Sequence, residues 1–284
     1  MDKILVVPNT LKDADLSVTK KVLNKLREFE ITPIINKEFC NIVGDLSEYF
    51  TTYPTDAQAL LVIGGDGSVI DASKIAISLN IPLLGVNLGN LGYLSEVEID
   101  DLDILKKLKC DDYHISEKML LEAEIFKSGV NITSERLAVN DIIVSHSEYL
   151  GIADICLENS MREMVKYRAD AVVLATPAGS TAYALSSGGP IISHNLESIT
   201  ATPVSPHSFF NRSIVYSSNE ELKVSNIGNS VLKVSIDGRY FDSLESGDYC
   251  KIRKSDKQFR MLTFSDNSMF TTLFNKLKIL SNIE

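Results

Sequence analysis

The N-terminal part of the chain alternates short apolar runs with amphipathic stretches. The apolar runs predict buried strands at residues 4–7, 34–35, 59–63 and 82–86. Between them, apolar positions at helical spacing predict helices around 22–29, with Ser17 as N-cap, around 69–77 and around 102–108. The middle helix would turn one stripe inward, made of Val69, Ile70, Ser73 and Ile77. Because strands without a polar face are buried on both sides, this alternation predicts a parallel, doubly wound sheet.

Beyond residue 112 the pattern changes to short runs separated by turn residues. These runs predict strands at 119–126, 137–144, 152–157, 164–167, 171–175, 213–216, 231–236, 249–253 and 259–264. Residues 127–131 and Asp237-Gly238 predict hairpin turns, and the spacing favours a type I′ turn for the second. We therefore expect an α/β domain over 1–112, a β-sandwich over 113–265, and a helix at 266–284 that packs back on the first domain.

Composition and charge narrow the range of functions. The 284 residues are 44% hydrophobic and 23% charged, which is typical of a globular protein of one large or two ordinary domains. The net charge of -10 weighs against a nucleic-acid-binding surface. The basic cluster at 251–260 alternates with apolar residues, so a solvated strand face explains it better than a phosphate-binding patch. A nucleotide site in this chain must draw its positive potential from N–H groups, single cations or a metal.

The sequence also bears on location. No apolar run approaches the ~20 residues that span a bilayer, and residues 1–8 do not resemble a signal peptide. The four cysteines form no C-x-x-C and the four histidines no H-x-x-x-H, so we expect free thiols in a reducing compartment and no metal-ligand pattern. We predict a cytoplasmic protein that binds neither nucleic acid nor membrane.

The segment Gly64-Gly65-Asp66-Gly67-Ser68 follows a buried strand and opens a helix. Ligands bind at this edge of an α/β sheet, and glycines let the backbone approach a phosphate. A carboxylate repels phosphate, so Asp66 suits a site where it takes a proton from an attacking hydroxyl or where Mg²⁺ lies between. A plain strand-to-helix turn is the alternative. The P-loop motif is absent, and Ile70 stands where the dinucleotide-binding fingerprint requires glycine.

Three further segments place small or polar residues beside predicted strands. Asn87-Leu88-Gly89-Asn90-Leu91-Gly92-Tyr93 would lie beside the first loop at the same sheet edge, with Tyr93 stacking on a base or capping the core. Asn140-Asp141 interrupts an apolar run, as an edge bulge or as a pair that binds ribose hydroxyls or a carboxamide. Residues 174–190 crowd hydroxyls, an aromatic ring and backbone N–H groups together, as a nucleotide site requires.

Taken in order, these segments resemble the NAD kinase family. The matches run from about residue 60 to about residue 240, and they also include Thr176-Pro177-x-Gly179-Ser180-Thr181-Ala182-Tyr183, Gly188-Gly189-Pro190 and Ser205-Pro206-His207. The block at 176–190 is highly specific, whereas phosphofructokinases and the diacylglycerol and sphingosine kinases share the first loop.

The resemblance implies a kinase that phosphorylates the adenosine-ribose 2′-hydroxyl of NAD to give NADP. ATP would be the phosphoryl donor, and Mg²⁺ or another divalent cation would be required. The implied fold is a phosphofructokinase-like α/β domain followed by a β-sandwich, with NAD between them. Members of the family form dimers or tetramers in which a neighbouring subunit completes the site.

The resemblance also implies a role for each matched residue. Asp66 would be the general base or the carboxylate that orients the 2′-hydroxyl, while Gly65, Gly67 and Ser68 would approach phosphate. The residues expected to bind the dinucleotide are Asn87, Tyr93, Asn140, Asp141, Arg168, Asp170, Thr181, Ala182 and Tyr183. Among these, Asn140 and Asp141 would hold polar groups of the adenosine, and Asp170 would reach the dinucleotide across a subunit interface.

The chain departs from the family pattern at several positions. Ala178 replaces a hydroxyl residue, Asp141 replaces a longer Glu, and Arg239 stands where Gln or Lys is common. Alanines flank Asp170 in place of glycines, and Arg212 lacks a following proline. These changes concern affinity and selectivity. Two alternatives stay open: a lipid kinase, which would need a membrane-facing surface, and a non-catalytic NADP(H)-binding sensor, which would not need Asp66.

Overall fold

A computed structural model describes residues 1–54, 56–89, 92, 94–132, 136–147, 151–207 and 210–264. They form two compact units. The first comprises Met1–Glu117 with the described residues from Phe259 onward, and the second is Lys118–Gln258. The helix predicted at 266–284 lies outside the described residues. Within them, no helix is both long enough and apolar enough to cross a membrane.

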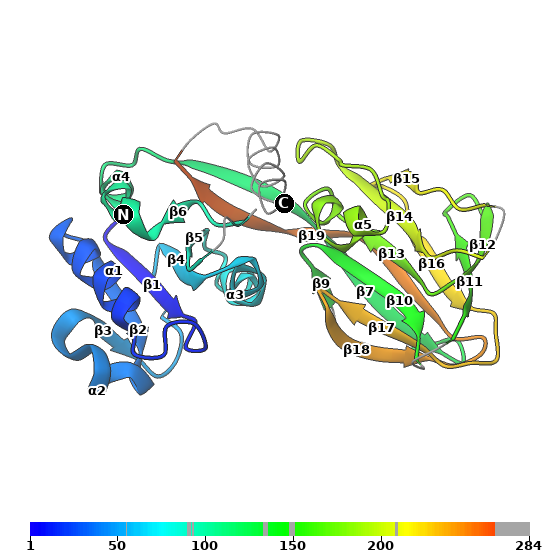
Figure 1. Ribbon diagram of the computed structural model, residues 1–284, viewed down its shortest axis with the longest axis horizontal. Helices are drawn as coiled ribbons and strands as arrows, with labels where there is room; N and C mark the ends of the chain where they lie inside the picture. Colours follow the sequence, from blue (N-terminus) through cyan, green and yellow to red (C-terminus); the bar gives the residue numbers. More distant parts are fainter. Residues whose placement is uncertain are drawn as a thin grey trace, which may run out of the picture. The chain divides into compact units, whose positions relative to one another are not determined.

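The first unit is built on a parallel sheet with the strand order β5-β4-β1-β2-β3, and β6 pairs with β5 (Figure 1). Its strands are β1 (Lys3–Pro8), β2 (Thr32–Asn36), β3 (Glu48–Phe50), β4 (Ala59–Gly64), β5 (Leu83–Asn87) and β6 (Val97–Glu98). The predicted parallel sheet is confirmed. The sequence pattern missed β3 and β6, which are too short to show a period.

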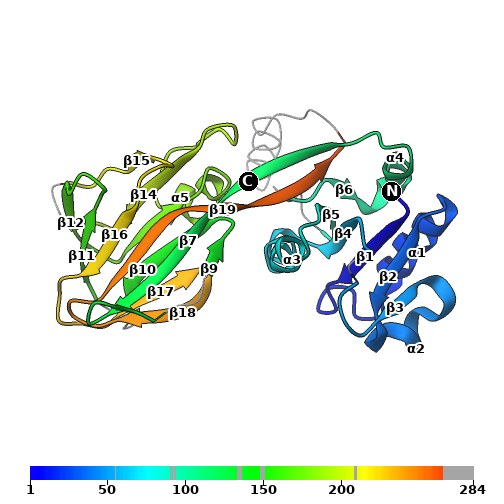
Figure 2. The ribbon, with the colours of Figure 1, turned by 180° about the vertical axis from the view of Figure 1, so that it is seen from behind.

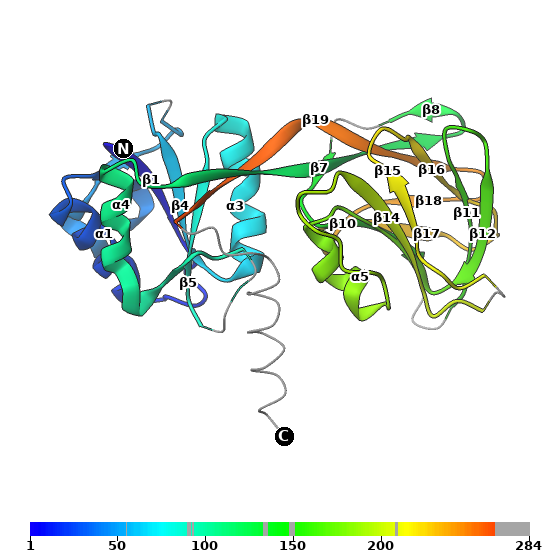
Figure 3. The ribbon, with the colours of Figure 1, turned by 90° about the horizontal axis from the view of Figure 1, so that it is seen from above.

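Helices lie on both faces of this sheet, as Figure 3 shows for α1 and α4 on one side and α3 on the other. The helical segments are α1 (Ser17–Glu28), η1 (Lys37–Phe39), α2 (Cys40–Val43), η2 (Gly44–Leu46), α3 (Asp66–Leu79), η3 (Ile99–Leu105) and α4 (Lys106–Lys109). Apolar side chains of α1, η3 and α4 share one core with Ile4, Val6, Leu61 and Ile63 of the sheet. This double covering explains why all six residues of β4 are buried.

The N-terminus of α1 differs from the prediction. The helix begins at Ser17, so Ser17 is its first residue and not its cap. Asp13 takes the capping role from four residues upstream, because its carboxylate accepts the N–H groups of Val18 at 3.1 Å and Thr19 at 2.8 Å. Leu16 makes this reach possible by adopting a left-handed conformation, with φ of 54°.

The buried stripe of α3 also differs in part. Val69 and Ser73 are buried as predicted, but Ile70 and Ile77 are only half-buried. Ala72 and Ala76 take the inward places. Small side chains let the helix lie close to the sheet. In α3, side-chain size therefore decides which positions face inward more than hydrophobicity does.

The second unit contains two antiparallel sheets. One has the order β15-β14-β13-β10-β17-β18, and Figure 2 shows the β17–β18 hairpin alongside β10. The other contains β12-β11-β16-β19, with β7 pairing β19, β8 and β9. The elements are β7 (His114–Lys127), β8 (Val130–Asn131), β9 (Arg136–Ala138), β10 (Asp141–His146), β11 (Ala153–Glu158), β12 (Met164–Ala169), β13 (Ala171–Ala175), η4 (Gly179–Thr181), α5 (Tyr183–Ser186), β14 (Ser198–Val204), β15 (Ile214–Ser217), β16 (Leu222–Asn226), β17 (Leu232–Ile236), β18 (Arg239–Leu244) and β19 (Tyr249–Thr263).

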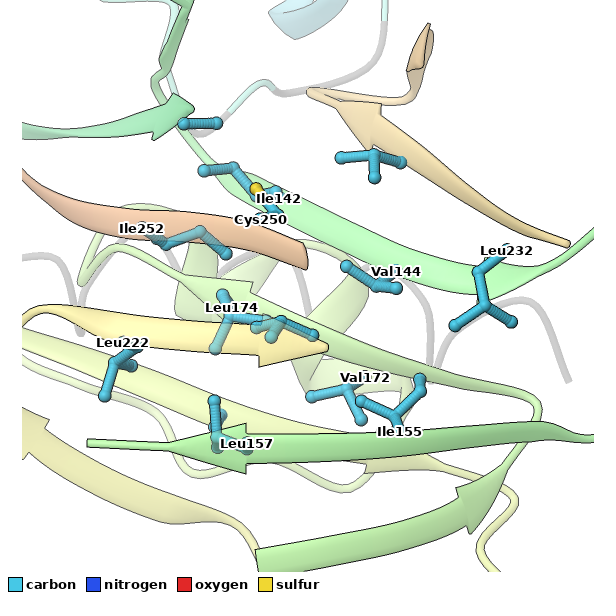
Figure 4. Close-up of a cluster of buried hydrophobic side chains, with 14 of the residues drawn as sticks. Ile142, Val144, Ile155, Leu157, Val172, Leu174, Leu222, Leu232, Cys250 and Ile252 are labelled. Carbon is cyan, nitrogen blue, oxygen red and sulfur yellow. The ribbon is translucent and has the colours of Figure 1, made fainter. Parts of the chain in front are cut away.

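One apolar core joins the two sheets and confirms the predicted sandwich (Figure 4). Ile142 and Leu174 come from one sheet, and Leu157, Leu222 and Ile252 come from the other. Each is almost completely buried, and burying such a side chain contributes roughly 1.5–3 kcal/mol.

Both predicted hairpin turns are present. Ser128 and Gly129 have φ of 50° and 81°, and Asp237 and Gly238 have φ of 48° and 75°. Positive φ at both central residues is the signature of a type I′ turn.

Strand boundaries in the second unit are less well predicted. The run at 137–144 is two strands, β9 and β10, which are separated around Asn140. The runs at 249–253 and 259–264 belong to the single strand β19. The pattern missed β14 because two of its buried positions are threonines, Thr200 and Thr202, each 1% exposed. Threonine counts as a polar residue when only the sequence is considered.

The basic residues at 251–260 lie on β19, and several are paired. Lys251 lies 2.7 Å from Glu221, Arg253 3.2 Å from Glu122, and Lys254 2.6 Å from Glu197. These pairs support the interpretation as a strand face and leave little positive charge there for a phosphate.

Candidate functional site

The loop at the end of β4 has the geometry of a strand-to-helix ligand site. β4 ends at Gly64, Gly65 is extended with φ of -101° and ψ of -171°, and α3 begins at Asp66. The N–H groups of a first helical turn have no partners within the helix, and the helix dipole favours an anion beside them. This arrangement places backbone donors and one carboxylate at the same spot.

Close contacts explain why the loop needs glycine at its start. A Cβ on Gly64 would lie 2.3 Å from the Ser68 hydroxyl. That hydroxyl accepts a hydrogen bond from the Asn9 amide at 2.7 Å, which ties the first turn of α3 to the end of β1. Ser68, predicted to approach phosphate, therefore also fixes the loop.

The two glycine-rich loops of the first unit meet at the sheet edge, as predicted. β4 and β5 pair in register up to Gly64 opposite Asn87. The Asp66 carboxylate accepts the N–H of Leu94 at 3.0 Å, and a Cβ on Gly92 would lie only 2.4 Å from the same oxygen. Gly92 is thus the residue that leaves room for the Asp66 carboxylate. Tyr93, the predicted aromatic residue, lies outside the described residues.

Two buried oxygen atoms suited to a hard cation belong to the same sheet edge, one on Asn87 opposite Gly64 and one on Ser95 beside Gly92. The Asn87 Nδ2 donates to Glu98 and to the Gly89 carbonyl, all at 3.1 Å, whereas its Oδ1 is buried without a partner among the described residues. The Ser95 hydroxyl is in the same situation and would lie 3.0 Å from a Cβ on Gly92. Carboxylate, amide and hydroxyl oxygens are ligands that Mg²⁺ accepts, so the residues present fit that ion.

Lys12 is a residue that the sequence interpretation missed. Its ammonium group lies 3.3 Å from the position that a Cβ on Gly65 would occupy. Asn9 directs the chain there, because its side-chain oxygen accepts the N–H groups of Leu11 at 3.0 Å and Lys12 at 3.2 Å. The position of Lys12 after the first predicted strand was a usable signal. Because β1 neighbours β4 and the carboxyl ends of parallel strands share one edge, residues that follow β1 lie near the loop that follows β4.

In the second unit, Asn140 and Asp141 lie at the start of β10. Asp141 pairs with Ala175 across the sheet and is only 4% exposed, whereas Asn140 is half-buried. Burial raises the pKa of Asp141 to about 7, and the negative charge of Asp237 adds to this effect. The carboxyl group is therefore poised to change charge near neutral pH.

The segment 176–180 is built against this pair. The Thr176 hydroxyl donates to the Val139 carbonyl at 2.7 Å and accepts the Gly179 N–H at 2.9 Å. A Cβ on Gly179 would lie 1.9 Å from the Asn140 carbonyl oxygen, so only glycine fits there. The buried Ser180 hydroxyl donates to the Pro177 carbonyl at 2.7 Å and accepts the Ile192 N–H at 3.0 Å. These residues shape the loop, a role that the sequence alone did not assign to them.

The next three residues are more accessible. Thr181 and Ala182 are half-buried, and Tyr183 is 45% exposed at the start of α5. They follow directly on the segment that touches Asn140, so these predicted binding residues lie at the same end of β10 as Asn140 and Asp141.

Arg168 and Asp170 lie elsewhere. Arg168 is exposed, with its guanidinium 3.9 Å from Asp154. The Asp170 carbonyl accepts the N–H of His146, which is the last residue of β10, whereas Asp141 is the first. The two ends are five residue steps apart along the strand, roughly 17 Å. Within one chain the structure does not bring Asp170 together with the Asn140–Asp141 pair.

Comparison with known proteins gives concordant results. The profile of the ATP-NAD kinase N-terminal domain matches residues 8–112, and that of the C-terminal domain matches residues 139–264. The chain is 32% identical over 281 residues to a protein named NAD kinase from Thermoanaerobacter sp. (strain X514), covering 98% of this chain and 99% of the relative. It is 31% identical over 283 residues to one from Lachnoclostridium phytofermentans, covering 97% and 99%.

Two solved structures share the fold. One is yeast NADH kinase complexed with NADH, with a TM-score of 0.85 and 20% identity, covering 98% of this chain and 88% of that chain. The other is an NAD kinase from Archaeoglobus fulgidus in complex with ATP, with a TM-score of 0.74 and 23% identity, covering 97% and 98%.

Proposed function

Because the chain belongs to the ATP-NAD kinase family, we propose that it transfers the γ-phosphoryl group of ATP to the adenosine-ribose 2′-hydroxyl of NAD, giving NADP and ADP. The observation that supports this most directly is Asp66. It opens α3 at the carboxyl end of β4, and Gly92 leaves space for its carboxylate. A non-catalytic sensor would have no need for that arrangement.

In the proposed mechanism, Asp66 holds the 2′-hydroxyl and accepts its proton as the oxygen attacks the γ-phosphorus. The new O–P bond forms while the bond to the β-phosphate oxygen breaks, and ADP leaves with that electron pair. Phosphoryl transfer depends mainly on positioning and charge neutralisation. The N–H groups at the start of α3 and the Lys12 ammonium supply positive potential locally, which an acidic chain needs.

A divalent cation, Mg²⁺ in the first instance, is part of the proposal. Oxygen atoms of Asp66, Ser95 and Asn87 are the protein groups that would hold it, together with the nucleotide phosphates. When bound, it would neutralise phosphate charge during transfer.

Recognition of the acceptor is assigned to the second unit. Asn140 and Asp141 would bind polar groups of the adenosine, and Thr181, Ala182 and Tyr183 would form a wall around the bases. The proximity of Asn140 to the 176–180 segment supports this assignment. Asp170 lies at the far end of β10 and Arg168 lies on β12 two residues before it, so we propose that they contribute to the site of a neighbouring subunit in a dimer or tetramer.

Cytoplasmic location completes the proposal. It rests on the sequence and on the four cysteines, which are all free thiols.

The decisive experiment is incubation of the purified chain with Mg-ATP and either NAD or diacylglycerol. We expect NADP, detected with an NADP-specific dehydrogenase, and no phosphorylated lipid. Asp66→Asn should fold normally yet lose activity by about 10²–10⁴-fold, as for a lost general base. Asp71→Asn, the same change five residues later on α3, is the matched control and should keep wild-type activity. Phosphatidic acid would support the lipid kinase, and NADP(H) binding without turnover would support the sensor.

Mixing subunits tests the proposed assembly. Asp66→Asn and Asp170→Asn chains should each be inactive alone. After mixing and exchange, some heteromers would contain one site with neither change, so part of the activity should return. Absence of recovery, with exchange verified by light scattering or labelled subunits, would assign Asp170 to a role within its own chain.

A further inference from the structure

The turn at Asp237-Gly238 carries more than turn geometry requires. Type I′ turns accept Asn, Asp or Gly at the first position, and Asn serves at least as well as Asp. In the same unit, Ser128-Gly129 makes a two-residue turn with positive φ using serine. Neither turn therefore needs a carboxylate for its backbone conformation, and the contacts of Asp237 require another explanation.

The Asp237 carboxylate accepts three successive backbone N–H groups. They belong to Val139 at 2.9 Å, Asn140 at 2.8 Å and Asp141 at 3.2 Å. In return, the Asp237 N–H donates to the Asp141 carbonyl at 3.0 Å. A carboxylate has about four lone-pair positions and can accept all three, whereas the single carbonyl oxygen of Asn has two. The residue type thus matches the number of donors that converge on it.

The remaining carbonyls of the segment are held from the other side. The Thr176 hydroxyl donates to the Val139 carbonyl at 2.7 Å, and the Thr176 N–H donates to the Asn140 carbonyl at 2.9 Å. Every peptide N–H and C=O of Val139, Asn140 and Asp141 therefore has a partner on Asp237 or Thr176. This segment interrupts a sheet, where ladder bonds would otherwise satisfy it, so the two residues replace the missing ladder.

We infer that Asp237 is a positioning residue that presents Asn140 and Asp141 to the acceptor nucleotide, acting through their backbone and not by contact with substrate. The inference rests on the proposed function for the identity of that nucleotide. Holding two side chains in place before binding lowers the entropy lost on binding, which appears as acceptor affinity.

The negative charge of Asp237 also affects the ionisation of Asp141. It helps to hold the pKa of Asp141 well above its usual range. Among the described residues, the elements that pack against Asp141 carry few other charges. Residues 171–180 of β13 and the following loop are uncharged. Lys233 on β17 lies opposite Ser145, Arg239 follows the turn, and Arg136 lies at the exposed start of β9. Replacing the Asp237 carboxylate with a neutral group should therefore let Asp141 ionise at lower pH.

The test compares Asp237→Asn and Asp237→Ser with the wild type. Both replacements suit the turn, and the second copies the residue at Ser128. We expect the KM for NAD and the Kd for NAD by calorimetry to rise about tenfold or more, with the KM for ATP changed less than about twofold. The limb of the kcat/KM profile that belongs to Asp141 should move to lower pH. Ser128→Asn, which alters the other turn, is the control and should leave all four quantities unchanged.

Either of two results would overturn the inference. One is a folded Asp237→Asn or Asp237→Ser enzyme with wild-type affinity for NAD and an unmoved pH profile. The other is fast amide hydrogen exchange at Val139, Asn140 and Asp141 in the wild-type enzyme without NAD, a measurement that holds even when both variants fail to fold. Failure of the proposed function is separate, because it would appear as absence of NADP formation by the wild type, whereas NAD affinity is measured without turnover.

Discussion

Replacing Asp141 with Asn should stabilise the folded protein more at pH 8 than at pH 5. Asp141 is 4% exposed in the wild type and its carboxyl group is close to the charge of Asp237, so the charged form is disfavoured in the folded state. The pKa of Asp141 is higher in the folded state than in the unfolded state. At pH values between these two pKa values, the folded protein therefore binds more protons than the unfolded chain does. Stability then falls as pH rises through that interval and levels off above the folded pKa.

The size of the effect follows from the two pKa values. The usual pKa is 3.8 and the folded value is about 7. By linkage, the raised pKa of Asp141 lowers the stability of the folded protein by about 4 kcal/mol at pH 8 and by about 2 kcal/mol at pH 5. Asn has nearly the same shape and no charge, so it removes this pH dependence. The stabilisation by Asp141→Asn should thus grow by about 2–3 kcal/mol between the two pH values.

Urea unfolding followed by circular dichroism measures the difference at each pH. Asp154→Asn is the matched control, because the same chemical change on β11 removes only a half-exposed carboxylate 3.9 Å from Arg168. Its effect should stay within about 0.5 kcal/mol at both pH values. A stability difference for Asp141→Asn that is the same at pH 5 and pH 8 would refute the reasoning.

Three further predictions concern single contacts. Gly92→Ala places a methyl group 2.4 Å from the Asp66 carboxylate, so kcat for NADP formation should fall by about 10²-fold while the melting temperature changes little. Gly179→Ala meets the Asn140 carbonyl at 1.9 Å, which should reduce stability in urea by about 1–3 kcal/mol and raise the KM for NAD. Lys12→Met should raise the KM for ATP by about tenfold without changing the KM for NAD, as steady-state kinetics would show.

The matched controls for these predictions lie nearby. Gly67→Ala adds a methyl group into open space on α3, directly after Asp66, and should affect kcat less than Gly92→Ala does. Lys21→Met removes an exposed lysine from α1 and should leave the KM for ATP unchanged. Equal effects of Lys12→Met and Lys21→Met would remove Lys12 from the phosphate site.

The first unit could be predicted well because its signals are local. A fully apolar β4 leads directly into glycines and then into the inward stripe of α3, so one short stretch of sequence predicts the strand, the loop and the helix. The same locality placed the Asn87 and Asp66 loops at one edge, since consecutive parallel strands end together. Lys12 escaped notice because β1 and β4 are separated by fifty residues that include two other strands.

The second unit shows where such reasoning ends. The contacts around Asn140 join residues 139–141 to Thr176 and Asp237, and the Asp237 bonds span up to 98 positions in the chain. No periodicity or spacing encodes which antiparallel strands become neighbours. Asp237 was therefore predicted only as a turn residue, and Thr176 and Ser180 only as members of a recognisable block. The register of β10 with β13 and β17 gives these residues their roles.

The block at 176–183 divides into residues that hold the shape of the loop and residues that are accessible to a ligand. Thr176, Gly179 and Ser180 are buried and bind only backbone, so their identity is dictated by the shape of the loop. Thr181 and Tyr183 retain exposed surface and are free to differ with the ligand. The residues that make a family recognisable are then mainly those that build its site, and selectivity must be sought in their accessible neighbours. Ala178 belongs to the first part, because it is 8% exposed and its carbonyl accepts the Thr181 hydroxyl at 3.2 Å. Any residue at this position supplies that carbonyl, so the departure from the family pattern should leave the Thr181 contact in place, and a side chain this buried offers little surface for direct contact with the dinucleotide.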